Sequence, residues 1–176
     1  MKQLLIILSV ILITSCTQPQ VEFREKIENA EKALWADSSV TPDRAKANDM
    51  IKMYVEFADK FQDDTSSGTY LFKAGDIAYR IRQPQQALDL FGRVQRYYLN
   101  PKAAVALFLQ GFINETELND KVKAKEHYES FLKKYPDHEL AKDVRITIGN
   151  LNKTDEEIVK EFEAKLQMQD SLAAAK

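Results

Sequence analysis

The feature of this sequence that most limits its fold is a pattern of large apolar residues that recurs every 37 residues. The three copies begin at Tyr54, Phe91 and Tyr128, and each places further apolar residues three and seven positions later. This spacing puts the side chains on one face of a helix. A period in the thirties is typical of a helical solenoid, in which neighbouring units bury one another's apolar faces. The sequence therefore predicts an all-α fold.

Small residues indicate how the helices pair. In the second copy Gly75 and Ala87 precede Phe91, and in the third copy Gly111 and Ala124 have comparable places. Glycine inside a helix costs about 1 kcal/mol relative to alanine, so these glycines need a packing reason. A close approach of two antiparallel helices would supply that reason.

These spacings resemble the consensus of the tetratricopeptide repeat (TPR), with Leu71 at its first large position and Pro136 closing the third unit. The resemblance implies a solenoid of antiparallel helix pairs. The first unit departs from the consensus, because Met50 replaces the alanine and its first helix has no glycine. The third unit has one extra residue in the turn at Glu117. We expect three TPR-like units.

Capping signals place the helix ends. Thr41-Pro42-Asp43 and Asn100-Pro101 are typical helix starts, Gly149-Asn150 is typical of a stop, and Thr154 with Glu157 forms a capping box. Together these signals predict four antiparallel pairs, at residues 22–36 and 42–62, 67–82 and 84–98, 101–116 and 120–135, and 138–149 and 155–170. The last pair lacks the alanine and aromatic marks and is expected to be a C-terminal hairpin that caps the core, followed by a frayed tail at 171–176.

The N-terminus has the pattern of an export signal. Lys2 precedes an apolar run from Leu4 to Ile13, and the single cysteine of the chain follows. A ten-residue helix spans about 15 Å, too short for a hydrocarbon core of about 30 Å, so the run predicts a secretory signal. A lone cysteine in an exported protein cannot form an internal disulfide.

The residues around that cysteine resemble the lipobox of bacterial lipoproteins, namely Ile13, Thr14, Ser15 and Cys16. The resemblance implies cleavage after Ser15 and acylation of Cys16, including palmitate. The alternative is a free cysteine in an ordinary signal peptide. Because Thr17 is not the aspartate that directs retention at the inner membrane, we expect the periplasmic face of the outer membrane. The expected organisation is a signal peptide at 1–15, a lipidated tether at 16–21 and a TPR-like domain at 22–170.

The sequence contains no constellation typical of an enzyme. The net charge of −2 includes no concentrated basic face for nucleic acid. His127 and His138 lie in polar surroundings, and no metal-ligand spacing, nucleophile motif or phosphate loop is present. We predict a protein that is not an enzyme, with no catalytic residues, bound metal or cofactor.

The TPR resemblance implies that the first helix of each pair lines a concave face. The positions that then face a partner are Phe72, Asp76 and Tyr79 in the second unit and Phe108, Phe112 and Glu115 in the third, with Thr69 and Val105 beside them. These positions are more apolar than a solvated face requires, which favours a groove for a peptide or helix. Two alternatives remain: terminal helices of the chain cover the face, or the rings turn into the core.

The predicted function is a lipid-anchored periplasmic scaffold or adaptor for other envelope proteins, in cell-envelope assembly or maintenance. Its plan is similar to TPR lipoproteins of outer-membrane β-barrel assembly and to TPR regions that work with the Tol–Pal system. The alternative is an accessory ligand-binding lipoprotein of a nutrient-uptake system, similar to the longer starch-utilisation lipoproteins of Bacteroidota. An envelope hydrolase is disfavoured, because the sequence offers no catalytic set.

Overall fold

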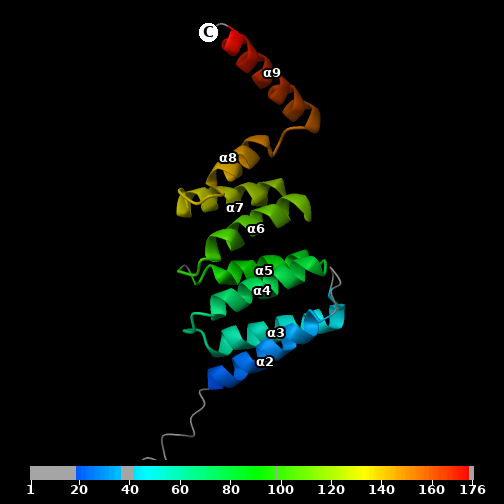
Figure 1. The fold of residues 1–176 in the computed structure, drawn as a ribbon, viewed down its shortest axis with the longest axis vertical. Helices are drawn as coiled ribbons and strands as arrows, with labels where there is room; N and C mark the ends of the chain where they lie inside the picture. Colours follow the sequence, from blue (N-terminus) through cyan, green and yellow to red (C-terminus); the bar gives the residue numbers. More distant parts are fainter. Residues whose placement is uncertain (1–18, 37–41, 98, 175–176) are drawn as a thin grey trace, which may run out of the picture. The chain divides into compact units, whose positions relative to one another are not determined.

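A computed structural model describes residues 19–36, 42–97 and 99–174, and over these ranges the chain is helical and has no strand (Figure 1). The helices are α2 (Pro19–Leu34), α3 (Arg44–Lys60), α4 (Ser67–Arg80), α5 (Pro84–Val94), α6 (Ala103–Thr116), α7 (Lys121–Lys134), α8 (Ala141–Asn150) and α9 (Asp155–Ala174). Each predicted helix is present, so the all-α prediction of paired helices is confirmed. Within the described ranges, no helix is both long and apolar enough to cross a membrane. Ile13, Thr14, Ser15 and Cys16 lie outside the described residues.

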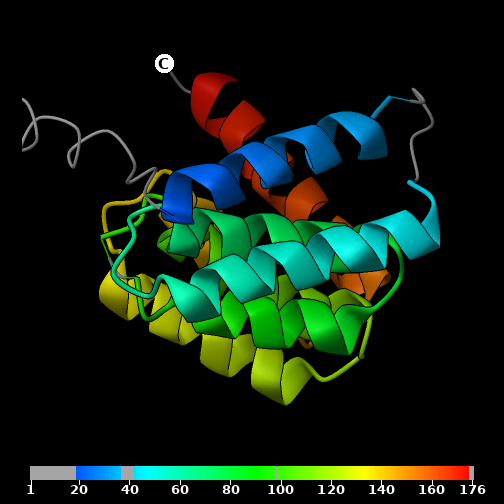
Figure 2. The same ribbon diagram turned by 90° about the horizontal axis from the view of Figure 1, so that it is seen from below.

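The chain divides into two compact units, one ending at Ala103 and one beginning at Ala104. Unit 1 contains α2 to α5, in which each helix packs against the next, and α2 and α3 run nearly side by side in Figure 2. Unit 2 contains α7, α8, α9 and nearly all of α6.

The 37-residue pattern forms the cores of both units. Tyr54, Phe91 and Tyr128 are each at most 2% exposed. The residues three positions later, Phe57, Val94 and Phe131, are fully buried. The period therefore marks the inward face of α3, α5 and α7, as the sequence predicted.

Gly75 and Gly111 allow the close packing of helices that was expected of them. A Cβ atom on Gly75 would lie 2.8 Å from Cε1 of Phe91, and one on Gly111 would lie 2.5 Å from Cε1 of Tyr128. Both distances are shorter than a carbon–carbon contact allows, so in each pair the aromatic ring occupies the space that a side chain on the glycine would need.

The first helix pair departs from the predicted boundaries. α3 begins at Arg44 rather than at 42, and the carboxylate of Asp43 caps it by accepting a hydrogen bond of 2.9 Å from the backbone N–H of Lys46. The predicted cap Thr41 lies outside the described residues. α2 begins at Pro19, so residues 19–21 are helical where a tether was predicted. The connection between α2 and α3 spans residues 35–43, whereas the connection between α4 and α5 spans only residues 81–83. Because of the longer connection, α2 is out of phase with the 37-residue repeat.

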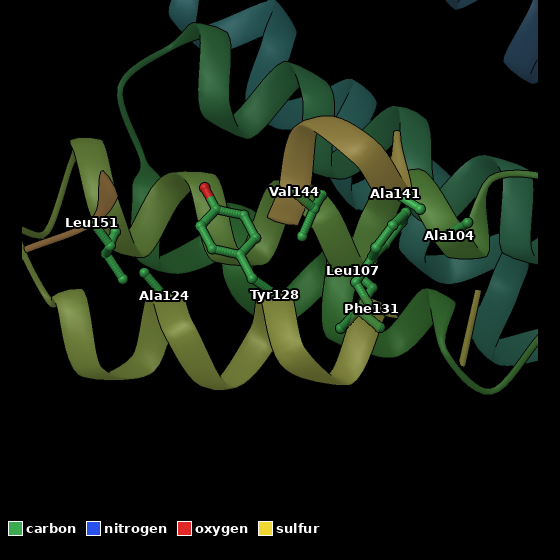
Figure 3. Close-up of a cluster of buried hydrophobic side chains, with 8 residues drawn as sticks. All are labelled: Ala104, Leu107, Ala124, Tyr128, Phe131, Ala141, Val144 and Leu151. Carbon is green, nitrogen blue, oxygen red and sulfur yellow. The ribbon is translucent and has the colours of Figure 1, made fainter. Parts of the chain in front are cut away.

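The core of unit 2 is built by three helices. Tyr128 and Phe131 of α7 pack with Leu107 of α6 and with Ala141 and Val144 of α8 (Figure 3). The predicted cap over the core is therefore formed by α8. α8 continues through Asn150, so Gly149 is a helical residue rather than the predicted stop.

The prediction that α9 also covers the core was wrong. Val159 is 54% exposed and Phe162 is 62% exposed, and the other described side chains of α9 are exposed except Ile158. The predicted capping box is confirmed, since Thr154 N–H donates to Oε2 of Glu157 (2.8 Å) and Glu157 N–H donates to Oγ1 of Thr154 (3.3 Å). α9 also extends to Ala174, through most of the predicted frayed tail.

Candidate functional site

A pocket of about 210 Å³ lies in unit 1 among α2, α3 and α4. Its lining is drawn from all three helices and from the residue after α2, and consists of Glu31, Trp35, Tyr54, Phe72, Lys73, Asp76 and Ile77. Two of the residues predicted to contact a partner, Phe72 and Asp76, are therefore brought together here. Tyr79, one turn further along α4, is half-buried and does not line the pocket.

A hydrogen-bonded carboxylate joins the three helices at this pocket. Oε1 of Glu31 accepts a hydrogen bond from the Tyr54 hydroxyl (2.5 Å) and one from Nζ of Lys73 (2.7 Å). Burial alone would raise the pKa of Glu31, but the hydrogen bonds from Lys73 and Tyr54 outweigh it and leave the pKa below its usual range. Glu31 is therefore ionised at neutral pH, and Lys73 balances its charge.

Lys73 is held by the surrounding rings as well. Its Nζ lies 5.8 Å from the ring centre of Tyr54 and the same distance from that of Tyr70, within the range of a cation–π contact. Burial, followed by the interaction with Glu31, raises the pKa of the Tyr54 hydroxyl, so the hydroxyl remains a donor to the carboxylate. These contacts fix the polar side of the pocket.

Two aromatic side chains form its apolar side. Trp35, the single tryptophan of the chain, is 43% exposed. Phe72 is half-buried, packs on Phe91 with ring centres 5.4 Å apart, and has Nζ of Lys102 5.5 Å from its ring centre. Asp76 is paired with Arg80 (2.8 Å). The pocket therefore combines an accessible aromatic surface with an ion-paired rim, an arrangement suited to an amphipathic side chain.

The residues predicted for the third unit have different surroundings. Phe108 packs against the buried rings of Tyr128 (5.9 Å between centres) and Phe131 (6.5 Å) and stacks with Phe112 (6.3 Å). Glu115 accepts a hydrogen bond of 2.7 Å from the Tyr128 hydroxyl. Phe108 and Glu115 thus take part in the packing of unit 2. For Phe108 this is the anticipated alternative in which the ring turns into the core. Val105 is half-buried.

A second pocket, of about 380 Å³, lies in unit 1 between the α3–α4 loop and the segment after α5. Thr69 lines it, and its Oγ1 accepts a hydrogen bond of 3.0 Å from Nδ2 of Asn100. Asp64 also lines it and is ion-paired with Arg24. The polar groups of this pocket hold the loops together, so we regard the α2–α4 pocket as the stronger candidate.

The two histidines lie within α7 and in the segment that follows it. His127 is half-buried, and burial lowers its pKa, while Nδ1 of His138 accepts the backbone N–H of Leu140 at 3.2 Å. Among the described residues, no group of three or more His, Cys, Asp and Glu side chains could hold a metal ion.

Sequence reasoning missed Glu31, Trp35 and Lys73. Trp35 lies 37 residues before Phe72, one repeat period, but α2 is out of phase with the repeat, so this spacing did not indicate a shared site. No sequence pattern indicated the ion pair of Glu31 and Lys73, which joins residues 42 positions apart.

Comparison with known proteins found a match to the tetratricopeptide repeat family over residues 69–98 and 105–138. No curated protein matches the sequence. The two matched segments correspond to α4 with α5 and to α6 with α7, and α2 and α3 lie outside the match. The chain therefore carries two helix pairs similar to tetratricopeptide repeats, within an all-α fold of paired helices.

Proposed function

We propose that this chain is a lipid-anchored periplasmic protein that holds other envelope proteins or peptides, as a scaffold or adaptor in cell-envelope assembly or maintenance. Tetratricopeptide repeats generally mediate protein–protein interactions. The observation that carries the proposal for this chain is the α2–α4 pocket, where Trp35 and Phe72 lie beside the ion pairs of Lys73 and Asp76. Aromatic anchors with a polar rim are typical of the central contacts of protein interfaces.

The proposed anchor has a geometric consequence for unit 1. α2 begins at Pro19, three residues after Cys16. Three residues reach at most about 11 Å when fully extended. A lipid on Cys16 would therefore hold the N-terminus of α2 close to the membrane surface, and a partner would approach unit 1 beside the bilayer. We expect that membrane to be the outer membrane, at its periplasmic face.

The alternative is an accessory ligand-binding lipoprotein of a nutrient-uptake system, in which Trp35 would stack on a sugar ring. The volume of about 210 Å³ disfavours it, because pockets for small molecules usually measure roughly 300–1,000 Å³. A single inserted side chain of a protein partner fits the observed space better.

Trp35 allows a direct test, because the fluorescence of the single tryptophan reports on the pocket. A photo-crosslinking residue at position 35, introduced into the full chain in cells, should capture an envelope protein. The same residue at Val122, which is 71% exposed on α7, serves as the control. In the unaltered chain, which keeps Trp35, a peptide from the captured protein should then shift the tryptophan emission to shorter wavelength and reduce its quenching by iodide.

The outcomes separate the two functions. Capture at position 35 that is equal to capture at 122, or a peptide that leaves the fluorescence unchanged, would contradict the scaffold proposal. A shift produced by soluble oligosaccharides, without protein capture, would favour the nutrient-uptake alternative.

A further inference from the structure

The exposed apolar face of α9 has no role in the pocket or in the core of unit 2. Val159, Phe162 and Leu166 lie on one side of this helix at spacings of three and four, and each is at least 44% exposed. Helices in proteins owe most of their stability to packing of such a face. α9 is 20 residues long and begins with a complete capping box, yet its apolar face has no partner among the described residues.

The charge of α9 argues against a membrane as that partner. From 155 to 174 the sequence contains six acidic residues and two lysines. Helices that lie on bilayers carry lysine and arginine on their polar face and are attracted to anionic lipid. α9 has the opposite charge balance, so its apolar face is better suited to protein.

We propose that α9 pairs in parallel with α9 of a second copy of this chain. Val159, Phe162 and Leu166 then each face their own counterparts, at the alternating spacing of a two-stranded coiled coil. The next position of this seam is Gln169. In a parallel pair the two Gln169 amides meet and can hydrogen-bond to each other, and a polar pair of this kind fixes the register.

The flanking charges also select the parallel arrangement. In a parallel pair, the residue directly before Leu166 in the seam faces the residue five positions later in the other helix. Lys165 therefore faces Asp170 of the second copy, and this contact occurs once on each side of the seam. Ile158 faces Glu163 of the second copy, so no like charges meet between Ile158 and Asp170. The like-charge pair of this register is that of Asp155, at the first residue of the helix.

An antiparallel pair centred on Phe162 and Leu166 is unfavourable. It would set Glu163 against Glu163 and Lys165 against Lys165, and it would bury Gln169 against Val159 without a hydrogen-bond partner. Like charges at these positions repel, and an unpaired amide is costly to bury. The distribution of charge and polarity along α9 therefore favours a parallel pair over the antiparallel one.

Disulfide trapping in the full chain, in whole lysates of the expressing cells, tests this pairing. Gln169→Cys places a thiol in the seam, and Ala164→Cys places one on the opposite face of the same helix. The unaltered chain, with Cys16 as its sole cysteine, is the blank. Under mild oxidation we expect a linked dimer from Gln169→Cys and little from Ala164→Cys or the blank.

Charge exchange tests the direction of the pair. In the Gln169→Cys chain, Lys165→Glu turns two attractive pairs into repulsive ones and should lower the association constant roughly tenfold. Lys165→Glu combined with Asp170→Lys should restore it. The proposal would be overturned by equal amounts of linked dimer from the 164 and 169 variants, or by no linked dimer from the 169 variant. It would also be overturned if the double exchange did not restore the association lost with Lys165→Glu. The affected side chains are exposed, and circular dichroism verifies that the helix content is unchanged. The pairing does not rest on the proposed envelope function.

Discussion

Replacing Gly111 with alanine should destabilise unit 2, although alanine is the better helix former. The new Cβ would lie 2.5 Å from Cε1 and 2.6 Å from Cδ1 of Tyr128. The ring cannot easily give way, because Tyr128 is 1% exposed and its hydroxyl is held by Glu115 at 2.7 Å. Overpacking of this kind costs about 1–3 kcal/mol, and the gain in helix propensity returns about 1 kcal/mol. We expect a net loss of up to about 2 kcal/mol in the free energy of unfolding.

The same substitution at Gly149 provides a matched control. Nothing lies within 4 Å of a Cβ at that position in α8, so only the propensity gain remains, and stability should rise by less than about 1 kcal/mol. Urea denaturation followed by circular dichroism measures both changes. If Gly111→Ala proved as stable as Gly149→Ala, the close approach of α6 and α7 would not be the reason for the glycine.

Three further predictions concern pH, capping and lipidation. Burial and a carboxylate partner raise the pKa of the Tyr54 and Tyr128 hydroxyls above the value of about 10 expected in the unfolded chain. Because the unfolded chain then loses these protons first, stability should fall as the pH rises above about 10, and Tyr128→Phe should reduce that slope in urea titrations. Asp43→Ala removes the cap of α3 and should lower the free energy of unfolding by about 1 kcal/mol, measured against Asp49→Ala on the exposed face of the same helix. Cys16→Ser should abolish incorporation of labelled palmitate and release the protein from the membrane fraction, whereas Cys16→Ser with no change in either would refute the predicted lipobox.

The inward faces of α3, α5 and α7 could be predicted because a repeat fixes them three times over. The glycines were predictable for the same reason, since Gly75 and Gly111 recur against Phe91 and Tyr128. α2 lacks such a marker, and residues 35–43 separate it from α3, so the repeat could not transfer its register to that helix. Trp35, which follows α2, was therefore left out of the predicted site.

The placement of α9 could not be predicted from its own residues. Its pattern of Val159, Phe162 and Leu166 shows that one face is apolar, and the capping box shows where the helix begins. Neither feature specifies which surface covers the face. The core of unit 2 is already closed by Ala141, Val144 and Leu151, so the apolar pattern was assigned to the wrong partner.

The carboxylates beside the repeat aromatics could not be predicted, because apolar periodicity does not distinguish tyrosine from phenylalanine. Tyr54 and Tyr128 have the same place in the repeat as Phe91, but each carries a hydroxyl that needs a partner in a buried setting. Glu31 and Glu115 supply it. Removing either carboxylate would leave a buried donor unpaired, at a cost of about 1–3 kcal/mol, so Glu115 has a structural reason to be present that is independent of any partner.

The two carboxylates nevertheless differ in what surrounds them. Glu31 is also paired with Lys73 and lies beside the accessible ring of Trp35, in a pocket that Phe72 shares. Beside Glu115, Phe108 packs against Tyr128 and Phe131. The same tyrosine–glutamate contact thus supports an open aromatic pocket in unit 1 and closed packing in unit 2. A partner should therefore respond to substitution of Trp35 more strongly than to substitution of Phe112.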